Sequence, residues 1–299
     1  MKRFLHIIVN QQSRNSVRNF KDLVLELPKY TNHYKIHQTK NLEQLTKLLT
    51  LLKETINPED IIIFVGGDGS LNQGVTLLEE YAIPNTIGYL PSGSGNDFAR
   101  VHGISNNIAK SVAHFFRVKE ARELAIIHVN QGTHNYYAVN SFGIGIDGLV
   151  NQMMADKDKG SGSSTYLSSA IKAFKSFKPF PIHLKVDDGI YTYKEAQIAL
   201  VTNNPYFGGG LKIVPQASSE DDILEVVIAE KATFKDLLII LSRLVLNKSH
   251  LKNKKIDLHQ TKKLALFIDS SQYGQKDGEV FHQEGYALTF ETKQRSFWL

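Results

Sequence analysis

Two glycine-rich turns contain the side chains best suited to chemistry. The first, GGDGS at 66–70, follows the uncharged, β-branched run 61–65, which is too short for a helix and predicts a buried strand. Glycines let backbone N–H groups approach a phosphate, and the helix start predicted at Leu71 favours negative charge. Asp68 is acidic where an anion would bind, so we expect a cation beside it or a proton transfer to it. The alternative is an ordinary turn with Asp68 as helix cap.

A second turn of the same kind follows the next predicted strand. Residues 86–100, TIGYLPSGSGNDFAR, again predict a strand, a turn and a helix start. The ends of neighbouring parallel strands line one crevice, which is the usual ligand site of an open α/β sheet. A carboxylate and an amide such as Asp97 and Asn96 can orient a phosphate-bound Mg²⁺ through waters. A bare Asn-Asp pair favours a helix cap instead, and we expect the metal role only because the pair lies within GSGNDFAR.

Composition excludes several kinds of protein. The 299 residues are 42% hydrophobic and 22% charged, as in globular proteins, and no cysteine is available for a disulfide or thiolate site. No uncharged apolar run approaches the ~20 residues of a membrane span. The start, MKRFLHIIVN, predicts a first strand better than a secretory signal, so we expect a cytoplasmic protein. The net charge of +5 suits an anionic partner without choosing between nucleotide, nucleic acid and membrane.

Apolar periodicity predicts an N-terminal α/β domain over residues 1–122. Strands and helices alternate, which argues for a parallel doubly wound sheet. The segments besides the two glycine-rich units are a strand at 4–9, a helix at 17–27, a strand at 34–37, a helix at 42–52 and a helix at about 106–117.

After about residue 122 the pattern changes to closely spaced strands, which predicts an antiparallel β-sandwich over 123–291. A polar Gly/Ser loop is expected at 156–164, with helices at 166–177 and 233–246. The expected strands are 124–130, 136–142, 182–187, 190–201, 223–230, 263–268 and 286–291.

The two turns together closely resemble the diacylglycerol kinase catalytic family, in particular the soluble bacterial lipid kinases. The family motifs are GGDGT and GTGNDFAR, so Ser70 and Ser94 replace threonines and keep the hydroxyl. Further motifs agree in order: NSFGIGID at 140–147, NNPYFGGGLKIVPQA at 203–217 and Asp-Gly-Glu at 277–279. The resemblance covers essentially the whole chain.

The resemblance implies a nucleotide-binding domain, a β-sandwich domain for the lipid substrate, and a last segment, 292–299, that returns to the first domain. It implies ATP and Mg²⁺ as cofactors and transfer of phosphate to a lipid alcohol, with diacylglycerol giving phosphatidate. A homodimer is expected from the family. We expect contact with an anionic membrane surface and no nucleic-acid partner.

The expected site residues fall into three groups. The ATP site comprises Asn10, Ser13, Arg14, Thr39, Gly66, Gly67, Asp68, Gly69, Ser70, Leu71, Asn72, Ser94, Asn96 and Asp97, of which 10–14 and Thr39 rest on the resemblance alone. By resemblance, Asp221 and the carbonyls of Ser218 and Ile223 hold a structural Mg²⁺, and Glu279 is the general base. Asp68 is also expected to be catalytic, on a solvent-facing turn that contributes little to the core.

Four features depart from the family or allow other interpretations. The first turn lacks the proline and glycine of N-P-x-S-G, and the strand at 124–127 is apolar where the family often has Asp. Read alone, Asp-Gly-Glu predicts a hairpin turn with a surface glutamate, and a glycine triplet predicts a bulge or turn. An NAD kinase, which shares GGDGT but not GTGNDFAR, and a regulator without catalysis remain alternatives.

The apolar helix at 233–246 precedes a basic run with four lysines, Lys248, Lys252, Lys254 and Lys255. An apolar face beside basic residues is typical of binding at a membrane surface. The alternative is a helix packed on the sandwich and followed by a solvated loop.

Overall fold

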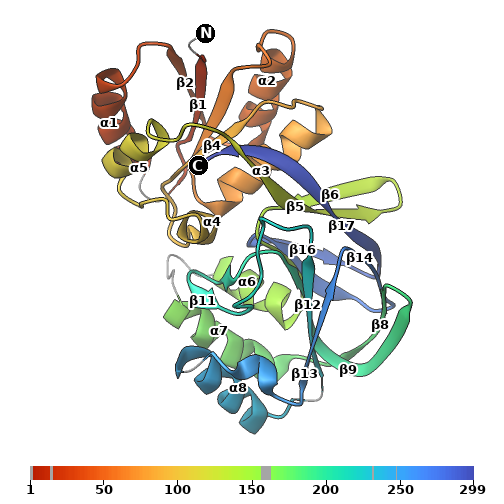
Figure 1. Cartoon of the computed structure of the whole chain (residues 1–299). Coiled ribbons are helices and arrows are strands. Elements are labelled where there is room, and N and C mark those ends of the chain that lie inside the picture. Colours follow the sequence, from red (N-terminus) through yellow and green to blue (C-terminus); the bar gives the residue numbers. More distant parts are fainter. Residues whose placement is uncertain (1–2, 14–15, 156–162, 231, 247) are drawn as a thin grey trace. The chain divides into compact units, whose positions relative to one another are not determined.

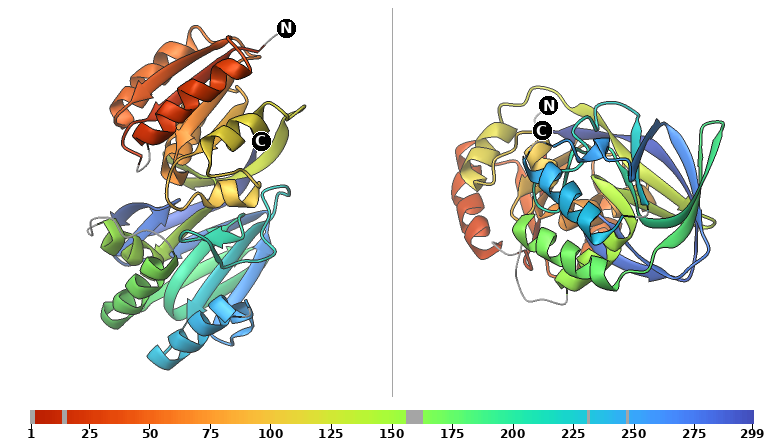
Figure 2. Two further views of the ribbon diagram at one scale, coloured as in Figure 1. Left: turned by 90° about the vertical axis from the view of Figure 1, so that its left-hand side faces the viewer. Right: turned by 90° about the horizontal axis from the view of Figure 1, so that it is seen from below.

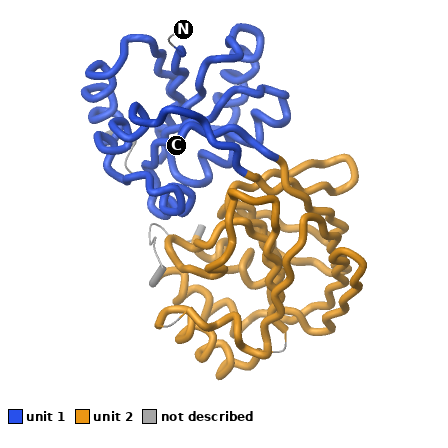
Figure 3. Tube along the Cα trace, viewed as in Figure 1, with its two compact units in different colours: residues 1–124, 294–299 blue, residues 125–293 orange. Residues whose placement is uncertain are grey.

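The computed structural model describes residues 3–13, 16–155, 163–230, 232–246 and 248–299 (Figure 1). The chain forms two compact units. Unit 1 comprises Met1–Leu124 and Gln294–Leu299, and unit 2 comprises Ala125–Lys293 (Figure 3). The sequence predicted this boundary at residue 122. Two predictions fall outside the described residues: Arg14 as an ATP contact, and residues 156–162 of the polar Gly/Ser loop.

Unit 1 alternates strands and helices, which confirms the predicted α/β domain. Its elements are β1 (Leu5–Asn10), α1 (Ser16–Glu26), the 3₁₀ helix η1 (Leu27–Lys29), β2 (Tyr34–Thr39), α2 (Leu42–Lys53), β3 (Ile61–Gly66), α3 (Asp68–Glu80), β4 (Ile87–Pro91), α4 (Asp97–Val101) and α5 (Ile108–Phe115).

The sheet of unit 1 is parallel, in the order β2-β1-β3-β4, and the end of β17 (Tyr286–Trp298) pairs with β4 in parallel as well. Side chains alternate between its faces. Ile61 and Ile63 join the apolar cluster formed with α1 and α5, whereas Phe64 contacts α3, where a Cβ on Gly74 would overlap its ring. Both glycine-rich turns therefore leave the same, carboxyl edge of the sheet.

Unit 2 is built mainly from strands, with three α-helices in its described part. It contains β5 (Arg122–Gln131), β6 (His134–Ala138), β7 (Ser141–Gly145), α6 (Ile146–Ala155), α7 (Ser163–Ser176), β8 (Phe180–Val186), β9 (Gly189–Thr202), β10 (Tyr206–Phe207), β11 (Leu211–Lys212), β12 (Leu224–Glu230), α8 (Phe234–Leu246), the 3₁₀ helix η2 (His250–Lys252), β13 (Ile256–Thr261), β14 (Lys263–Ile268), β15 (Gln272–Lys276), β16 (Glu279–Gln283) and most of β17.

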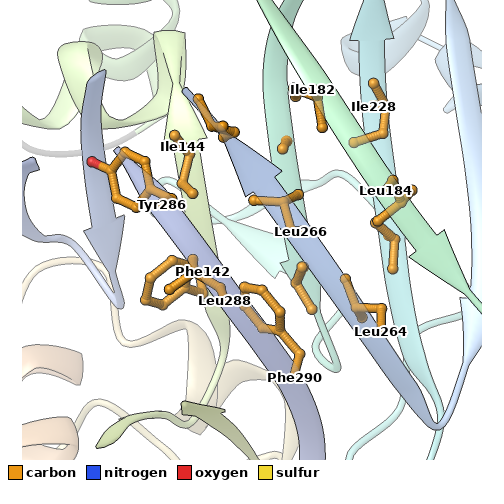
Figure 4. Close-up of a cluster of buried hydrophobic side chains, with 14 of the residues drawn as sticks. Phe142, Ile144, Ile182, Leu184, Ile228, Leu264, Leu266, Tyr286, Leu288 and Phe290 are labelled. Atoms are coloured by element: carbon orange, nitrogen blue, oxygen red, sulfur yellow. The ribbon is translucent and has the colours of Figure 1, made fainter. Parts of the chain in front are cut away.

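The long strand β9 organises the antiparallel sandwich of unit 2. Its first half pairs with β8, and its second half, Ala196–Thr202, pairs with β7 and β12. The buried core of unit 2 includes Phe142 from β7, Leu266 from β14 and Phe290 from β17 (Figure 4). Rings of Phe142 and Phe290 meet edge to face with centroids 5.4 Å apart. The β-sandwich predicted from the strand spacing is confirmed.

Some predicted elements are wrong in detail. The strand expected over 136–142 is two strands, β6 and β7, because the backbone N–H groups of Val139 and Asn140 bond to the Asp277 carboxylate. Helix α6 and strands β13, β15 and β16 were not predicted. None of the described helices is long and apolar enough to cross a membrane.

The C-terminal segment is fixed in unit 1 by a buried arginine. The Arg295 guanidinium lies 3.2 Å from a Glu79 carboxylate oxygen on α3 and donates hydrogen bonds to the carbonyls of Ile83 and Asn85 at 2.9 and 3.1 Å. Trp298 adds a bond from its indole N–H to the Phe115 carbonyl at 3.1 Å. These contacts hold the end of β17, the last strand, in unit 1.

Arg295→Met should lower the free energy of unfolding of unit 1 by about 3–5 kcal/mol, because Glu79 then stays buried without its cation. Lys47→Met is the matched control in the same unit: Lys47 pairs with Glu43 at 2.7 Å on the surface of α2, so its loss should cost about 0–1 kcal/mol. Urea denaturation followed by fluorescence of Trp298, the single tryptophan, measures both. Equal effects of the two changes would contradict this account.

Candidate functional site

The two glycine-rich loops of unit 1 touch each other. The Ser92 amide donates to the Gly66 carbonyl at 2.7 Å, which extends the pairing of β3 and β4 beyond the strands. A Cβ on Gly93 would lie 2.5 Å from the Cα of Gly67, so a side chain cannot be placed there without moving backbone. Glycine is needed because the two loops pack backbone to backbone.

Asp68 joins the two loops. Its Oδ2 accepts the Asp97 amide at 3.0 Å and its Oδ1 accepts the Phe98 amide at 3.1 Å, so it caps α4, which begins at Asp97. The side chain is half-buried, and the expectation of a solvent-facing residue with little structural role is wrong. Burial, and then the charge of Asp97, raises the pKa of Asp68 to about 6, against the lowering effect of its backbone hydrogen bonds.

Asn96 shapes the second loop from within. It is buried and adopts a left-handed backbone conformation with φ of 51°. Its Oδ1 accepts the Gly93 amide at 3.1 Å, and its Nδ2 donates to the Gly93 carbonyl at 3.0 Å and to Asn106 at 2.9 Å. These bonds fix the loop conformation from which the predicted contact with Mg²⁺ would be made.

A small cavity of about 210 Å³ opens at the carboxyl ends of β1, β2 and β3, and Asn10, Thr39 and Ser70 are among its lining residues. The Asn10 Nδ2 donates to the Ser70 hydroxyl at 2.8 Å. Thr39 is buried and its carbonyl accepts the Gln11 amide at 2.9 Å. The structure thus brings together three expected ATP contacts from three separate strands or loops.

The other candidate ATP contacts of unit 1 differ in how exposed their side chains are. The Ser13 and Ser92 hydroxyls lie 2.9 Å apart, and Ser94 is exposed on the second loop. The side chains of Leu71 and Asn72 are fully buried, and the Leu71 amide already bonds to the Gly67 carbonyl at 3.1 Å. Gly67 gives α3 no side-chain cap, so the start of this helix, at Asp68 to Ser70, suits a phosphate.

In unit 2, Asp277 organises the Asp-Gly-Glu turn, a role that the sequence interpretation missed. Its carboxylate accepts the amides of Val139, Asn140 and Ser141 at 2.6, 2.8 and 2.9 Å. Both Asp277 and Gly278 have positive φ, 47° and 87°, as the two central residues of a tight hairpin require. The two positive φ values confirm the hairpin, and the carboxylate bonds tie it to the start of β7.

Glu279 is the first residue of β16, directly after this turn. One of its carboxylate oxygens lies 3.6 Å from the Lys276 ammonium, and the side chain is partly exposed. A partly exposed carboxylate on a turn fixed by Asp277 can accept a proton from a bound hydroxyl.

Asp147 supports the same turn from inside unit 2. It is fully buried, and its carboxylate accepts hydrogen bonds from Gln275 Nε2 at 2.8 Å and the Tyr166 hydroxyl at 3.1 Å. Gln275 in turn accepts the Gly278 amide at 2.8 Å through its Oε1. Burial raises the pKa of Asp147 to about 7, although both side-chain hydrogen bonds act to lower it.

The glycine triplet at 208–210 forms the turn between β10 and β11, and all three residues have positive φ. Asn204, just before it, donates to Asn140 Oδ1 at 2.6 Å. The triplet therefore confirms the turn interpretation, and its neighbour contacts the segment that Asp277 holds.

The turn expected to bind a structural Mg²⁺ lies directly before β12. Asp221 is exposed, and its Oδ1 accepts the Ile223 amide at 3.0 Å, while Ser218 at the start of the turn is partly exposed. Asp222, the next residue, instead pairs with Lys262 at 2.6 Å. Carboxylate and carbonyl oxygens on one short turn are donors that Mg²⁺ prefers, so the residues present fit the ion.

The buried Asp147 should make stability depend on pH. Its pKa is higher in the folded chain than the ordinary 3.8, so its contribution to stability falls as pH rises from about 4 to about 7. The variant Asp147→Asn has no carboxyl group that titrates at this position. The difference in the free energy of unfolding between the natural chain and this variant should therefore shrink from about pH 5 to about pH 8. Urea denaturation at both pH values measures this change.

Asp222→Asn is the control for that experiment. The hydrogen bond from Lys262 lowers the pKa of the surface carboxylate Asp222, so its titration lies below the range tested. A deficit of Asp147→Asn that is constant with pH would show that Asp147 is ionised throughout.

Comparison with known proteins gives matches over nearly the whole chain. The diacylglycerol kinase catalytic domain matches residues 5–129, and the YegS C-terminal NAD kinase beta sandwich-like domain matches residues 140–291. "Putative lipid kinase YtlR" of Bacillus subtilis is 24% identical over 293 residues, which cover 92% of each chain. "Putative lipid kinase SAS0691" of Staphylococcus aureus is 24% identical over 93% of this chain and 92% of that protein.

Solved structures agree on the fold. The crystal structure of "a putative diacylglycerol kinase" from Bacillus anthracis aligns with a TM-score of 0.79 at 22% identity, over 98% of this chain and 96% of that one. Another Bacillus anthracis structure, titled as a diacylglycerol kinase, aligns with a TM-score of 0.72 at 19% identity. The chain therefore belongs to the diacylglycerol kinase catalytic family and has a YegS C-terminal domain after its catalytic domain.

Proposed function

We propose that the chain is an ATP-dependent lipid kinase that transfers the γ-phosphoryl group of ATP to the hydroxyl of diacylglycerol and forms phosphatidate. The observation that supports this most is the contact of the two glycine-rich loops at the start of α3, where Asp68 links the first loop to the start of α4. Backbone amides and a helix start are suited to a phosphate chain.

Phosphoryl transfer depends chiefly on positioning and on electrostatic stabilisation of the transferred group. In this proposal the amides of the loops at 66–70 and 93–95 bind the phosphates, and the cavity beside Asn10 and Thr39 takes part of the nucleoside. Such a cavity at the carboxyl edge of a parallel sheet is where ligands of α/β proteins bind.

The choice of this nucleotide site rests on chemistry and not on size. A larger cavity of about 810 Å³ lies at the other, amino edge of the unit 1 sheet, with Arg3, Tyr30 and Trp298 in its lining. It has aromatic rings and an arginine, which stacks on Trp298 at 4.3 Å, but neither glycine-rich loop contributes to it. The cavity near Asn10 is smaller, and it adjoins the first loop and the start of α3.

Mg²⁺ would neutralise charge on the phosphates when bound. Asp68 and Asp97 would hold it, directly or through waters, because the two carboxylates lie close enough for the charge of Asp97 to raise the pKa of Asp68. Asp221 with the carbonyls of Ser218 and Ile223 would hold a separate, structural Mg²⁺. Both donor sets consist of hard oxygen atoms.

Glu279 takes the proton in the transfer step. The lipid hydroxyl oxygen bonds to the γ-phosphorus, the bond from that phosphorus to the bridging oxygen of ADP breaks, and the hydroxyl proton moves to the Glu279 carboxylate. Asp277 and the Asp147–Gln275 pair hold the turn that presents Glu279.

The test is a kinase assay with the purified chain, labelled ATP, Mg²⁺ and mixed micelles. Diacylglycerol, monoacylglycerol, ceramide, a sphingoid base and NAD are offered separately. Labelled phosphatidate is expected; labelled product from NAD alone would show an NAD kinase, and ATP binding without any labelled product would show a regulator. Light scattering of the same preparation tests the expected homodimer.

Glu279→Gln should lower kcat by about 10²–10⁴-fold, because the amide cannot accept the proton. Glu284→Gln, an exposed glutamate in the turn before β17, is the matched control and should leave the rate unchanged. A rate for Glu279→Gln within a few-fold of the natural chain, with its fold intact, would remove Glu279 as the base.

Asp68→Ala should abolish most activity and also destabilise unit 1 by about 1–2 kcal/mol, because the start of α4 loses both acceptors. Asp68→Asn keeps one acceptor oxygen, so it should lose activity with a smaller loss of stability. Urea denaturation and kinase rates are measured on the same samples. Retention of more than about a tenth of the activity by either variant would contradict a central role for the carboxylate.

A further inference from the structure

Helix α8 leaves four large apolar side chains exposed. Leu244 is the only buried residue of this helix, all of which the structure describes, whereas Phe234, Leu238, Val245 and Leu246 are 41%, 46%, 54% and 82% exposed. Positions 234, 238 and 245 follow helical spacing and lie along one side of the helix. Packing on the sandwich, the alternative considered for this helix, therefore accounts for only part of its apolar surface.

The exposed stripe continues onto the end of α7. Helices α7 and α8 lie side by side in unit 2 (Figure 2). The Phe174 ring on α7 lies 6.3 Å from the Phe234 ring, and the Lys175 ammonium lies 5.7 Å from the centroid of Phe234. We use the name α7–α8 face for the exposed or partly exposed residues of these two helices and of the segments that follow them, in which η2 contacts α8. Its members are Lys172, Phe174, Lys175, Lys178, Phe234, Lys235, Leu238, Val245, Leu246, Lys252 and Lys254.

The α7–α8 face is strongly basic. Residues 232–256 contain five lysines and one arginine against one acidic residue, Asp236, and residues 165–178 contain three lysines and no acidic residue. Asp236 caps its own helix: it accepts the Thr233 amide and hydroxyl, each at 2.8 Å. The bonds from Thr233, and then the charges of Lys255 and Lys254, lower the pKa of Asp236, which places both lysines near the start of α8.

We propose that the α7–α8 face docks on an anionic lipid bilayer, with the apolar stripe entering the interface and the lysines contacting headgroups. A polyanion such as nucleic acid would use the lysines but leave the stripe exposed, and a neutral apolar partner would leave the charge excess without a role. Apolar side chains flanked by lysines match the layering of an anionic membrane surface. Docking rests on and deepens the proposed function, because diacylglycerol lies in a bilayer.

Docking is tested on the full chain by co-sedimentation without ATP or diacylglycerol, so the result does not depend on kinase activity. The vesicles are phosphatidylcholine alone or phosphatidylcholine mixed with phosphatidylserine, at low and high salt. Binding to the anionic vesicles only, weakened by salt, is expected. Equal binding to both vesicle types, or none to either, would overturn the proposal.

The triple variant Lys235→Gln, Lys252→Gln, Lys254→Gln should lower binding at low salt on the order of 100-fold, since each lysine near the surface contributes about 5-fold. Lys47→Gln, Lys53→Gln, Lys110→Gln on unit 1 makes the same charge change at exposed positions and should bind like the natural chain. Equal loss in the two triple variants would mean that total charge, and not this face, controls binding.

A labelling experiment locates the contact even if a substitution weakens the fold. The chain has no cysteine, so Val245→Cys can carry one environment-sensitive fluorophore. We expect a blue shift on adding anionic vesicles, and no shift for the same label at Ile190→Cys, an exposed apolar position on β9. A shift at position 190 but not at 245 would overturn the proposal, whereas shifts as expected in a chain without kinase activity would support docking and reject the proposed reaction.

Discussion

The hydrogen bonds from the start of α4 to the Asp68 carboxylate are the interaction on which the candidate site depends. They join the first residue of α3, which follows β3, to the first two residues of α4, which follows β4, at 3.0 and 3.1 Å. With these bonds formed, Gly67 and Gly93 touch, Asn96 is enclosed, and the amides of both loops lie at one edge of the sheet. An acidic side chain is held among groups suited to anions because backbone amides partly offset the cost of its burial.

The same principle recurs in unit 2. Asp277 accepts three backbone amides and Asp147 accepts three side-chain donors, from Gln275, Tyr166 and Asn151. Each carboxylate therefore fixes a turn or strand end through bonds that apolar packing cannot supply. The sandwich core provides the stable frame, and these carboxylates set the position of Glu279. In unit 1, the buried pair of Arg295 and Glu79 fixes the last strand in a comparable way.

Local patterns were enough to predict the sheet of unit 1 and the sandwich class of unit 2. Strand β14 lies where its short apolar run, LALFI after Lys263, predicted a strand, whereas β15 is the polar segment QYGQK and carries no such run. The break after β6 could not be predicted, since the group that takes its backbone amides, Asp277, is far away in the sequence. The glycine motifs predicted the loops, but the bond from Asp68 to α4 is likewise a long-range contact.

The most direct measurement is a titration of the ¹⁵N-labelled chain with ATP and Mg²⁺, followed by amide chemical shifts. The account predicts that the largest changes occur at Gly67, Gly69, Gly93 and Thr39, with small changes at Arg3 and Trp298 in the larger cavity at the amino edge of the sheet. Largest changes at Arg3 and Trp298, or no change at the glycine-rich loops at saturating ATP, would contradict the assignment of these loops as the phosphate site.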